Sequence, residues 1–194
     1  MMRHIIGLDF CGTFFARQSL SDLSYFALLG RSFNDVPTFL KKPRISKVMQ
    51  GFFLLCTTEA KRVRAIREYT LRYGKEINNL LVEQYFLSKS NNEVFIASGS
   101  ILELIQEVCS LNGISCPIIA ASAFGSFGDR FHDFFKEPWT GATKVKKIIE
   151  RYPFVGEGIK LHTFETDSPI DRPVQSIAVN YREINTSERF HFNN

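Results

Sequence analysis

The spacing of apolar residues changes along the chain and divides it into three parts. Residues 4–10 are an apolar run of strand length. From about Ser19 to Ser90 apolar positions recur at helical intervals, which predicts successive helices with hardly a strand between them. Helices are expected at 19–30, 57–74 and 75–90, and the apolar stretch 44–56 is ambiguous but fits a helix.

Local signals indicate where these helices begin and end. Ser19 or Ser21 is the expected cap of the first, which ends on Gly30, and Thr58 is the expected cap of the helix that stops at Gly74. Apolar rows are expected at Ala60, Val63, Ile66 and Thr70 in that helix and at Ile77, Leu80, Leu81 and Phe86 in the next.

After residue 90 strands and helices alternate, which implies crossover connections and a mainly parallel sheet. Strands are expected at 93–98, 116–122, 159–166 and 176–181, and helices at 100–113 and 140–152. The predicted fold is a doubly wound, mainly parallel α/β core with an inserted α-helical cap. Residues 1–14 and 91–194 form the core, and residues 15–90 form the cap. The polar segment 185–194 is expected to be loosely held.

Composition fits an ordinary globular protein: 194 residues, 44% of them hydrophobic and 23% charged. No apolar run approaches the roughly 20 residues of a membrane span, and the N-terminal "MMRHIIGLDF" has no cleavage site of small residues, so it is expected to be mature structure. The four cysteines have no CxxC spacing, which favours reduced thiols in the cytoplasm over a zinc site.

The formal charge of +4 is mild, but basic residues cluster at 59–75. The cluster is interpreted first as a solvated helix face and second as a basic lip that attracts anionic substrates. The aromatic–basic interleaving of RNA-binding sheets is missing, so no nucleic-acid partner is expected.

Polar residues that suit a phosphate and magnesium site follow the predicted strands. Asp9 follows the first strand and Ser98 the second, Lys144 lies near the start of a helix, and Asp167 and Asp171 follow a later strand. Because ligands bind at the carboxyl ends of parallel strands, these residues are expected to converge. Carboxylates supply oxygen ligands to Mg²⁺, Ser98 and a helix N-terminus hold phosphate oxygens, and lysine offers a positive charge. An aspartate held between Mg²⁺ and lysine can attack phosphorus.

The segments "DFCGT", "IASGS", "GATKVKK" and "TDSPID" occur in the order typical of one protein family. With them the chain resembles the haloacid dehalogenase superfamily, in particular its branch similar to phosphoserine phosphatase. The resemblance implies a Mg²⁺-dependent hydrolase, most simply a phosphatase acting on a small phosphorylated metabolite through an aspartyl-phosphate.

The resemblance also implies a role for each matching residue. Asp9 would be the nucleophile and a magnesium ligand, and Cys11 would offer the metal its backbone carbonyl. Thr13 and Ser98, with Gly99 beside it, would contact the phosphoryl group, and Lys144 would neutralise its charge. Asp167 would bind magnesium, and Asp171 would support the metal site.

Cys11 is the main departure from the family pattern, because these phosphatases have a general acid–base aspartate there. Three alternatives follow: a slow phosphatase or one limited to good leaving groups, other chemistry such as that of dehalogenases or phosphonatases, or a phosphate-binding module without turnover. Arg17 would suit an acidic substrate better than phosphoserine. The lysines considered as Schiff-base formers of a phosphonatase are Lys41, Lys42, Lys47, Lys61 and Lys75.

Overall fold

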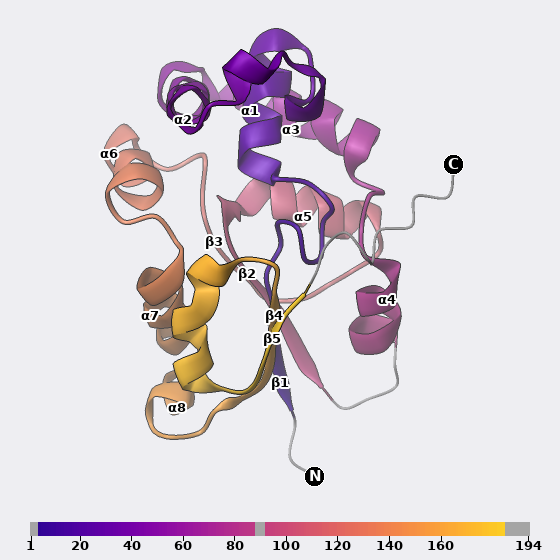
Figure 1. The fold of residues 1–194 in the computed structure, drawn as a ribbon, viewed down its shortest axis with the longest axis vertical. Coiled ribbons are helices and arrows are strands. Elements are labelled where there is room, and N and C mark those ends of the chain that lie inside the picture. The colour runs from indigo at the N-terminus through magenta and orange to yellow at the C-terminus, as the bar shows by residue number, and fades with distance from the viewer. Residues whose placement is uncertain (1–3, 88–91, 185–194) are drawn as a thin grey trace.

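A computed structural model describes residues 4–87 and 92–184 of the chain (Figure 1). Its centre is a five-stranded sheet with the order β3-β2-β1-β4-β5, and every neighbouring pair is parallel. The strands are β1 (Ile5–Leu8), β2 (Glu93–Ile101), β3 (Ile118–Ala121), β4 (Leu161–Thr166) and β5 (Ala178–Glu183). The predicted mainly parallel α/β core is confirmed.

Helices make the connections between the strands. The α-helices are α1 (Ser19–Leu29), α2 (Pro43–Gly51), α3 (Glu59–Tyr73), α4 (Asn79–Leu81), α5 (Leu102–Leu111), α6 (Phe127–Phe131), α7 (Gly141–Arg151) and α8 (Pro153–Gly156). Three segments are 3-10 helices: η1 (Phe33–Asp35), η2 (Thr38–Lys41) and η6 (Pro169–Ile177). Three are π-helical: η3 (Phe52–Cys56), η4 (Val82–Leu87) and η5 (His132–Lys136).

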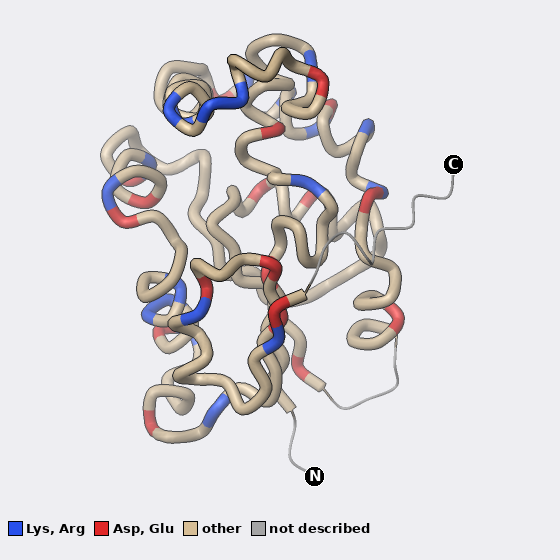
Figure 2. The backbone as a smooth tube through the Cα atoms, in the orientation of Figure 1, with Lys and Arg blue, Asp and Glu red and all other residues tan. Residues whose placement is uncertain are grey.

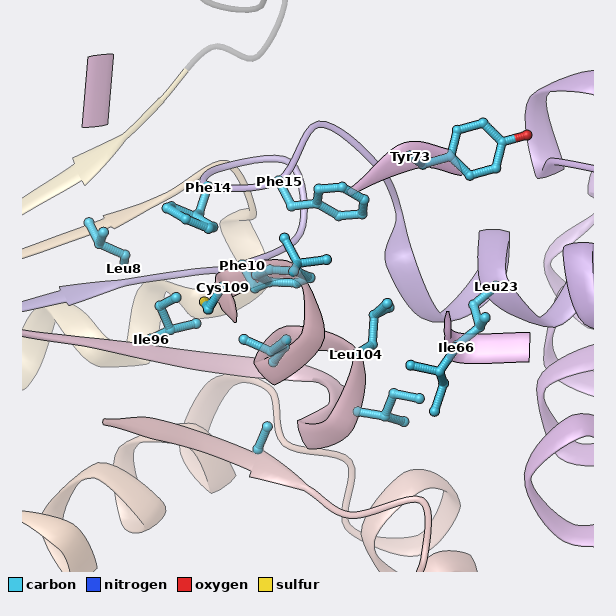
Figure 3. Close-up of a cluster of buried hydrophobic side chains, with 14 of the residues drawn as sticks. Leu8, Phe10, Phe14, Phe15, Leu23, Ile66, Tyr73, Ile96, Leu104 and Cys109 are labelled. Carbon is cyan, nitrogen blue, oxygen red and sulfur yellow. The ribbon is translucent and has the colours of Figure 1, made fainter. Parts of the chain in front are cut away.

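Alternate residues of the central strands build two hydrophobic clusters, one on each face of the sheet. In β2, Val94 and Ile96 join the cluster that includes α5 and the helices following β1, whereas Phe95 and Ala97 join the cluster with α7 and α8. Figure 3 shows part of the first cluster, where Phe10, Ile96 and Leu104 lie together. Because side chains alternate across a strand, a sheet covered on both faces is apolar throughout, which explains the unbroken apolar runs of the sequence.

The segment between β1 and β2 has two parts in space. Helices α1, α2 and α3 lie above the sheet in Figure 1, whereas α4 lies beside it. The following π-helix η4 contacts the core directly, since the Tyr85 hydroxyl donates to the Glu165 carboxylate of β4 over 2.5 Å. The division into a core and a 15–90 cap stays a prediction. The C-terminal part of segment 15–90 contacts the sheet through this hydrogen bond.

Several predicted helix ends are confirmed. The α1 helix ends at Gly30, whose φ is 67°, and α3 begins after Thr58, whose hydroxyl accepts from Lys61 N–H. Gly74 ends α3. The predicted cap of α1 is wrong. Gln18 holds the N-cap position and makes no side-chain hydrogen bond to the helix, and the buried Ser19 hydroxyl donates to the Ser100 hydroxyl instead. The ambiguous stretch 44–56 is helical in α2 and η3.

Both predicted apolar rows are partly wrong. In α3 Ala60 is exposed, and the buried side instead includes Arg62, Ala65 and Tyr69. In the next segment residues 75–78 are not helical, and Leu80 is 57% exposed. The side of each helix that is buried depends on its packing partners, and the spacing of apolar residues alone does not determine it. Helices at 127–136, which follow β3, were not predicted from the pattern.

Acidic and basic residues alternate along the described chain without a long block of one sign, as Figure 2 shows. In the basic segment 59–75, Arg64 pairs with Glu68 one turn away over 2.7 Å, a solvated helix pair. All four cysteines are free thiols. Among residues 4–87 and 92–184, no helix is long and apolar enough to cross a membrane. The predicted loose segment 185–194 lies outside the described residues.

Candidate active site

A cavity of about 410 Å³ opens beside the carboxyl ends of β1, β2 and β4. Residues from five separate segments of the chain line it, and the three that follow strands meet there because parallel strands deliver their ends to one edge of the sheet. The predicted site residues on its wall are Asp9, Cys11, Ser98, Gly99, Lys144, Asp167 and Asp171. Of the predicted residues, Thr13 does not line the cavity. The fold thus assembles nearly the whole predicted set in one place.

Asp9 directly follows β1 and is held there by the main chain. Its N–H donates to the carbonyl of Glu165 on β4 over 2.8 Å, so the strand pairing positions the carboxylate. Its Oδ1 accepts from Lys144 Nζ over 2.9 Å. Burial raises the pKa of Asp9 to about 6, Lys144 opposes the rise, and the charges of Asp171 and Asp167 add to it.

Lys144 comes from the first turns of α7 and is only 3% exposed. Its ammonium donates to Asp9 and, over 2.5 Å, to Asp171 Oδ2. Burial disfavours the ammonium, but the two carboxylate charges outweigh it and raise the pKa of Lys144. Asp171 Oδ2 also accepts from the Thr166 hydroxyl over 3.0 Å. Asp171 therefore fixes the lysine that in turn holds Asp9.

Asp167 reaches into the turn that follows β1. A Cβ on Gly12 would lie 1.9 Å from Asp167 Oδ2, and Gly12 has φ of 71°. Only glycine fits this combination of a left-handed backbone and a carboxylate in the side-chain space. Thr13 Oγ1 donates to Asp167 Oδ1 over 3.4 Å, so Thr13 supports this carboxylate from a buried position rather than from the cavity wall.

Ser98 lies in a β-bulge of β2, where the pairing with β3 shifts register between Ala97 and Ile101. The strand continues to Ile101, and α5 begins only at Leu102. The prediction that Ser98 leads directly into a helix N-terminus is therefore wrong. Instead its hydroxyl accepts from Ser100 N–H over 3.0 Å, and the bulge turns Ser98 and Gly99 toward the cavity.

The Cys11 thiol lies among hydroxyl groups. Its sulfur is 2.8 Å from Ser19 Oγ and 3.9 Å from Ser98 Oγ, and Ser19 donates on to Ser100 over 2.6 Å. Burial, and secondarily the charge of Asp9, raise the pKa of Cys11 to about 11. The thiol therefore stays protonated at neutral pH and cannot act as a general base there.

The donor set fits Mg²⁺. Three carboxylates, those of Asp9, Asp167 and Asp171, face the single ammonium of Lys144, and a divalent cation would balance the excess negative charge. Enzymes hold Mg²⁺ through one or two carboxylates together with substrate phosphates and water. In the described part of the chain no group of three or more acidic, histidine or cysteine side chains is placed to hold a metal ion by itself, so substrate phosphate and water would supply the remaining ligands.

Pattern analysis missed the part of the cavity lining that comes from the segment between β1 and β2. Gln18, Leu20, Ser21 and Gln50, all from the segment between β1 and β2, line it. They are isolated positions in helical segments, and no local signal marks them. The cavity is also lined by Ser100, Thr140 and Ser168. The sequence marks these residues only by their position next to the motif residues.

Arg17 does not line the cavity, which corrects the expectation that it serves an acidic substrate. Its guanidinium donates to both carboxylate oxygens of Glu76, over 2.6 and 2.8 Å, and to Asp22 over 2.9 Å. It also lies over the Tyr73 ring, 3.8 Å from the centroid. The guanidinium is thus fully used within the helical segment. No residue of 59–75 lines the cavity either.

The fold can be compared with solved structures. A crystal structure of a protein of unknown function from Bordetella pertussis Tohama I is similar with a TM-score of 0.62 and 14% identity, over 91% of this chain and 87% of that one. A haloacid dehalogenase (HAD) family hydrolase from Salmonella enterica serovar Typhi gives 0.54 and 12%, over 90% of this chain and 60% of that one.

A HAD-superfamily hydrolase of subfamily IA from Geobacter sulfurreducens gives a TM-score of 0.50 with 13% identity, over 93% of this chain and 88% of that chain. The chain shares the α/β fold of these HAD hydrolases. This confirms the mainly parallel α/β core that the sequence resemblance implied. The chain spans less than two thirds of the Salmonella hydrolase. No protein-family model and no curated protein matches the sequence.

Proposed function

We propose that the protein is a Mg²⁺-dependent hydrolase that cleaves phosphate esters through a covalent intermediate on Asp9. The observation that carries the proposal is the buried chain Asp9–Lys144–Asp171, with Asp167 beside it on the same cavity. A lone buried lysine bonded to two carboxylates gives a fixed, ionised nucleophile, and the open cavity gives a phosphoryl group access to it. When bound, Mg²⁺ would be held by Asp9, Asp167 and the Cys11 carbonyl and would neutralise phosphate charge.

In the first step Asp9 attacks phosphorus. Lys144 holds Oδ1 by a hydrogen bond, which leaves Oδ2 as the attacking atom. A bond forms between Oδ2 and phosphorus while the bond from phosphorus to the ester oxygen breaks, and that oxygen departs with the electron pair. Lys144, Ser98 and nearby N–H groups stabilise the charge on the phosphoryl oxygens.

In the second step water attacks phosphorus while the bond from phosphorus to Asp9 Oδ2 breaks. Inorganic phosphate leaves with Asp9 regenerated, and the proton that the water loses passes through solvent to the departed ester oxygen. Both steps normally gain from a general acid–base group, which typically contributes 10²–10⁴-fold. Cys11 holds its proton too tightly to act as base. Apart from Asp9, Asp167 and Asp171, which already have roles in this proposal, no carboxylate or histidine of the described chain lines the cavity. Turnover should therefore favour esters whose leaving oxygen needs no proton, such as aryl phosphates.

The specific alternative is a phosphate-binding module without turnover, which the raised pKa of Cys11 favours. A dehalogenase is less well supported, because Asp167 adds a carboxylate that a metal-free reaction does not need. A phosphonatase needs an amine for its Schiff base, and none of Lys41, Lys42, Lys47, Lys61 and Lys75 lines the cavity. The helical segment between β1 and β2 would act as the cap, since it supplies part of the cavity lining.

The test is phosphate release from an aryl phosphate and a panel of phosphorylated metabolites, with and without Mg²⁺. We expect magnesium-dependent release that Asp9→Asn abolishes and that the matched surface variant Asp35→Asn retains; Asp35 is exposed and outside the cavity. Binding of Mg²⁺ and phosphate without release would establish the binding-module alternative. Release that persists in Asp9→Asn would refute the nucleophile.

A further inference from the structure

Part of the cavity lining is neutral and includes members of a hydrogen-bonded group from the segment between β1 and β2. Gln50 Nε2 donates to Ser21 Oγ over 2.7 Å and to Ser46 Oγ over 3.4 Å, and Ser46 donates to Ser21 over 3.1 Å. Ser21 and Gln50 line the cavity, together with Gln18 and Leu20. We call Gln18, Leu20, Ser21 and Gln50 the neutral wall.

Charged side chains make up only a small part of the cavity lining. Every ionisable carboxylate or ammonium on its lining belongs to the phosphoryl end, namely Asp9, Lys144, Asp167 and Asp171. Arg17 directly precedes Gln18 in the sequence, but its guanidinium pairs with Asp22 and Glu76 and does not line the cavity. A ligand whose phosphate sits on Lys144 therefore presents its other end to uncharged groups.

The neutral wall still offers directed hydrogen bonds. Gln50 Nε2 donates to the hydroxyls of Ser21 and Ser46. Its Oε1 is left as an acceptor, and no described residue donates to it. The Gln18 amide makes no capping bond to α1. Ile170 and Leu20 add aliphatic surface nearby. A lining that offers both hydrogen-bonding and aliphatic groups suits a hydroxylated carbon chain.

We propose that the cavity selects phosphate esters whose remainder is uncharged and hydroxylated, such as polyol or sugar phosphates, over amino-acid or carboxylic-acid phosphates. The proposal rests on the phosphoryl site described above. A ligand ammonium or carboxylate placed against the neutral wall would lose water without gaining a counter-charge, which is costly, whereas a ligand hydroxyl exchanges water for amide and serine partners.

Three small probes with the same phosphoryl group separate these classes: glycerol 3-phosphate is neutral beyond the phosphate, phosphoethanolamine carries an ammonium, and 3-phosphoglycerate carries a carboxylate. Binding is measured by calorimetry with Mg²⁺ on Asp9→Asn, so that no probe is consumed. We expect glycerol 3-phosphate to bind at least about fivefold more tightly than either charged probe. Equal affinities, or tighter binding of a charged probe, would overturn the proposal.

A charge change in the wall sharpens the test. Gln50→Glu, added to Asp9→Asn, should shift the affinity ratio of phosphoethanolamine to glycerol 3-phosphate by roughly tenfold or more toward phosphoethanolamine. The matched control is Gln106→Glu, since Gln106 is an exposed glutamine of α5 outside the cavity, and it should leave the ratio unchanged. A shift of the same size in both variants would show that the wall does not read charge.

Inorganic phosphate separates failure of this inference from failure of the proposed function. If inorganic phosphate binds with Mg²⁺ while the three probes do not differ, the phosphoryl site stands and the selectivity proposal is wrong. If neither inorganic phosphate nor any probe binds, the phosphoryl site itself is wrong, and the selectivity proposal falls with it.

Discussion

Lys144 and Asp9 lie 135 residues apart in the chain, and their side chains meet over 2.9 Å in a nearly closed environment at the end of the sheet. Neither residue would remain charged there alone, because burial disfavours both charged forms. Asp171, the second acceptor of the Lys144 ammonium, completes the group. The site is therefore a mutually dependent set of charges, and removing one member should affect both stability and activity.

Lys144→Met should abolish activity and lower the free energy of unfolding by about 3–5 kcal/mol, because it leaves two carboxylates buried without their cation. Lys146→Met, an exposed neighbour on α7, should cost little. Denaturant titration in magnesium-free buffer measures both.

The same variant has a defined pH dependence. The raised pKa of Asp9 means that the folded state binds this proton more tightly than the unfolded state, so the contribution of Asp9 to stability declines as pH rises from about 4 to about 6. Without Lys144 the carboxyl groups must hold a proton or repel each other. The destabilisation should therefore be smaller at pH 4.5 than at pH 7.5, and an equal loss at both would contradict the charge argument.

Gly12→Ala should disrupt the site through Asp167. The new methyl group would overlap Asp167 Oδ2, which must move, and the Mg²⁺ concentration needed for half-maximal activity should rise at least tenfold. Gly30→Ala separates this effect from backbone strain, because Gly30 has φ of 67° but nothing within 4 Å of the added Cβ. That control should cost roughly 1–2 kcal/mol of stability and leave the magnesium dependence as it is.

Cys11→Asp should restore the missing acid–base group. We expect kcat/KM for an alkyl phosphate to rise by about 10²–10⁴-fold relative to that for an aryl phosphate, whose leaving group needs no proton. Cys11→Asn is the control, because the asparagine side chain has nearly the shape of aspartate but no carboxyl group to exchange a proton. A similar gain in Cys11→Asn would mean that the effect comes from shape rather than proton transfer.

The Cys11 thiol should resist alkylation in the folded protein. With a pKa of about 11, its thiolate is on the order of one molecule in a thousand at pH 8. Exposed Cys56 is the internal reference. Mass spectrometry after iodoacetamide treatment should show Cys56 modified first and Cys11 reacting faster only as pH approaches 11, with circular dichroism confirming that the protein stays folded. Equal labelling at pH 8 would refute the raised pKa.

Arg17→Met should destabilise the protein without altering its ligand preference. The change removes hydrogen bonds to Glu76, Asp22 and Ser32, which predicts a loss of roughly 1–3 kcal/mol. Thermal unfolding measures the loss, with exposed Arg31→Met as the control. If Arg17→Met weakened 3-phosphoglycerate binding selectively, the guanidinium would belong to the site after all.

The sequence by itself determined the core and the residues that its strand ends bring to the cavity. Apolar runs of strand length alternating with helical periods specify a parallel sheet covered on both faces, and strand ends in such a sheet meet at one edge. Asp9, Ser98 and Asp167 follow or lie at those ends, so their convergence on the cavity followed from local pattern and topology.

Only the tertiary structure decided the rest, because the deciding contacts join residues far apart in sequence. Arg17 pairs with Glu76, 59 positions away, and so is lost to any ligand. Gln50 reaches the cavity through the packing of α2 against α1. The bulge that turns Ser98 inward depends on its pairing with β3. The spacing of apolar residues indicates which side chains are buried. The packing of the helices and strands determines which other side chains they contact.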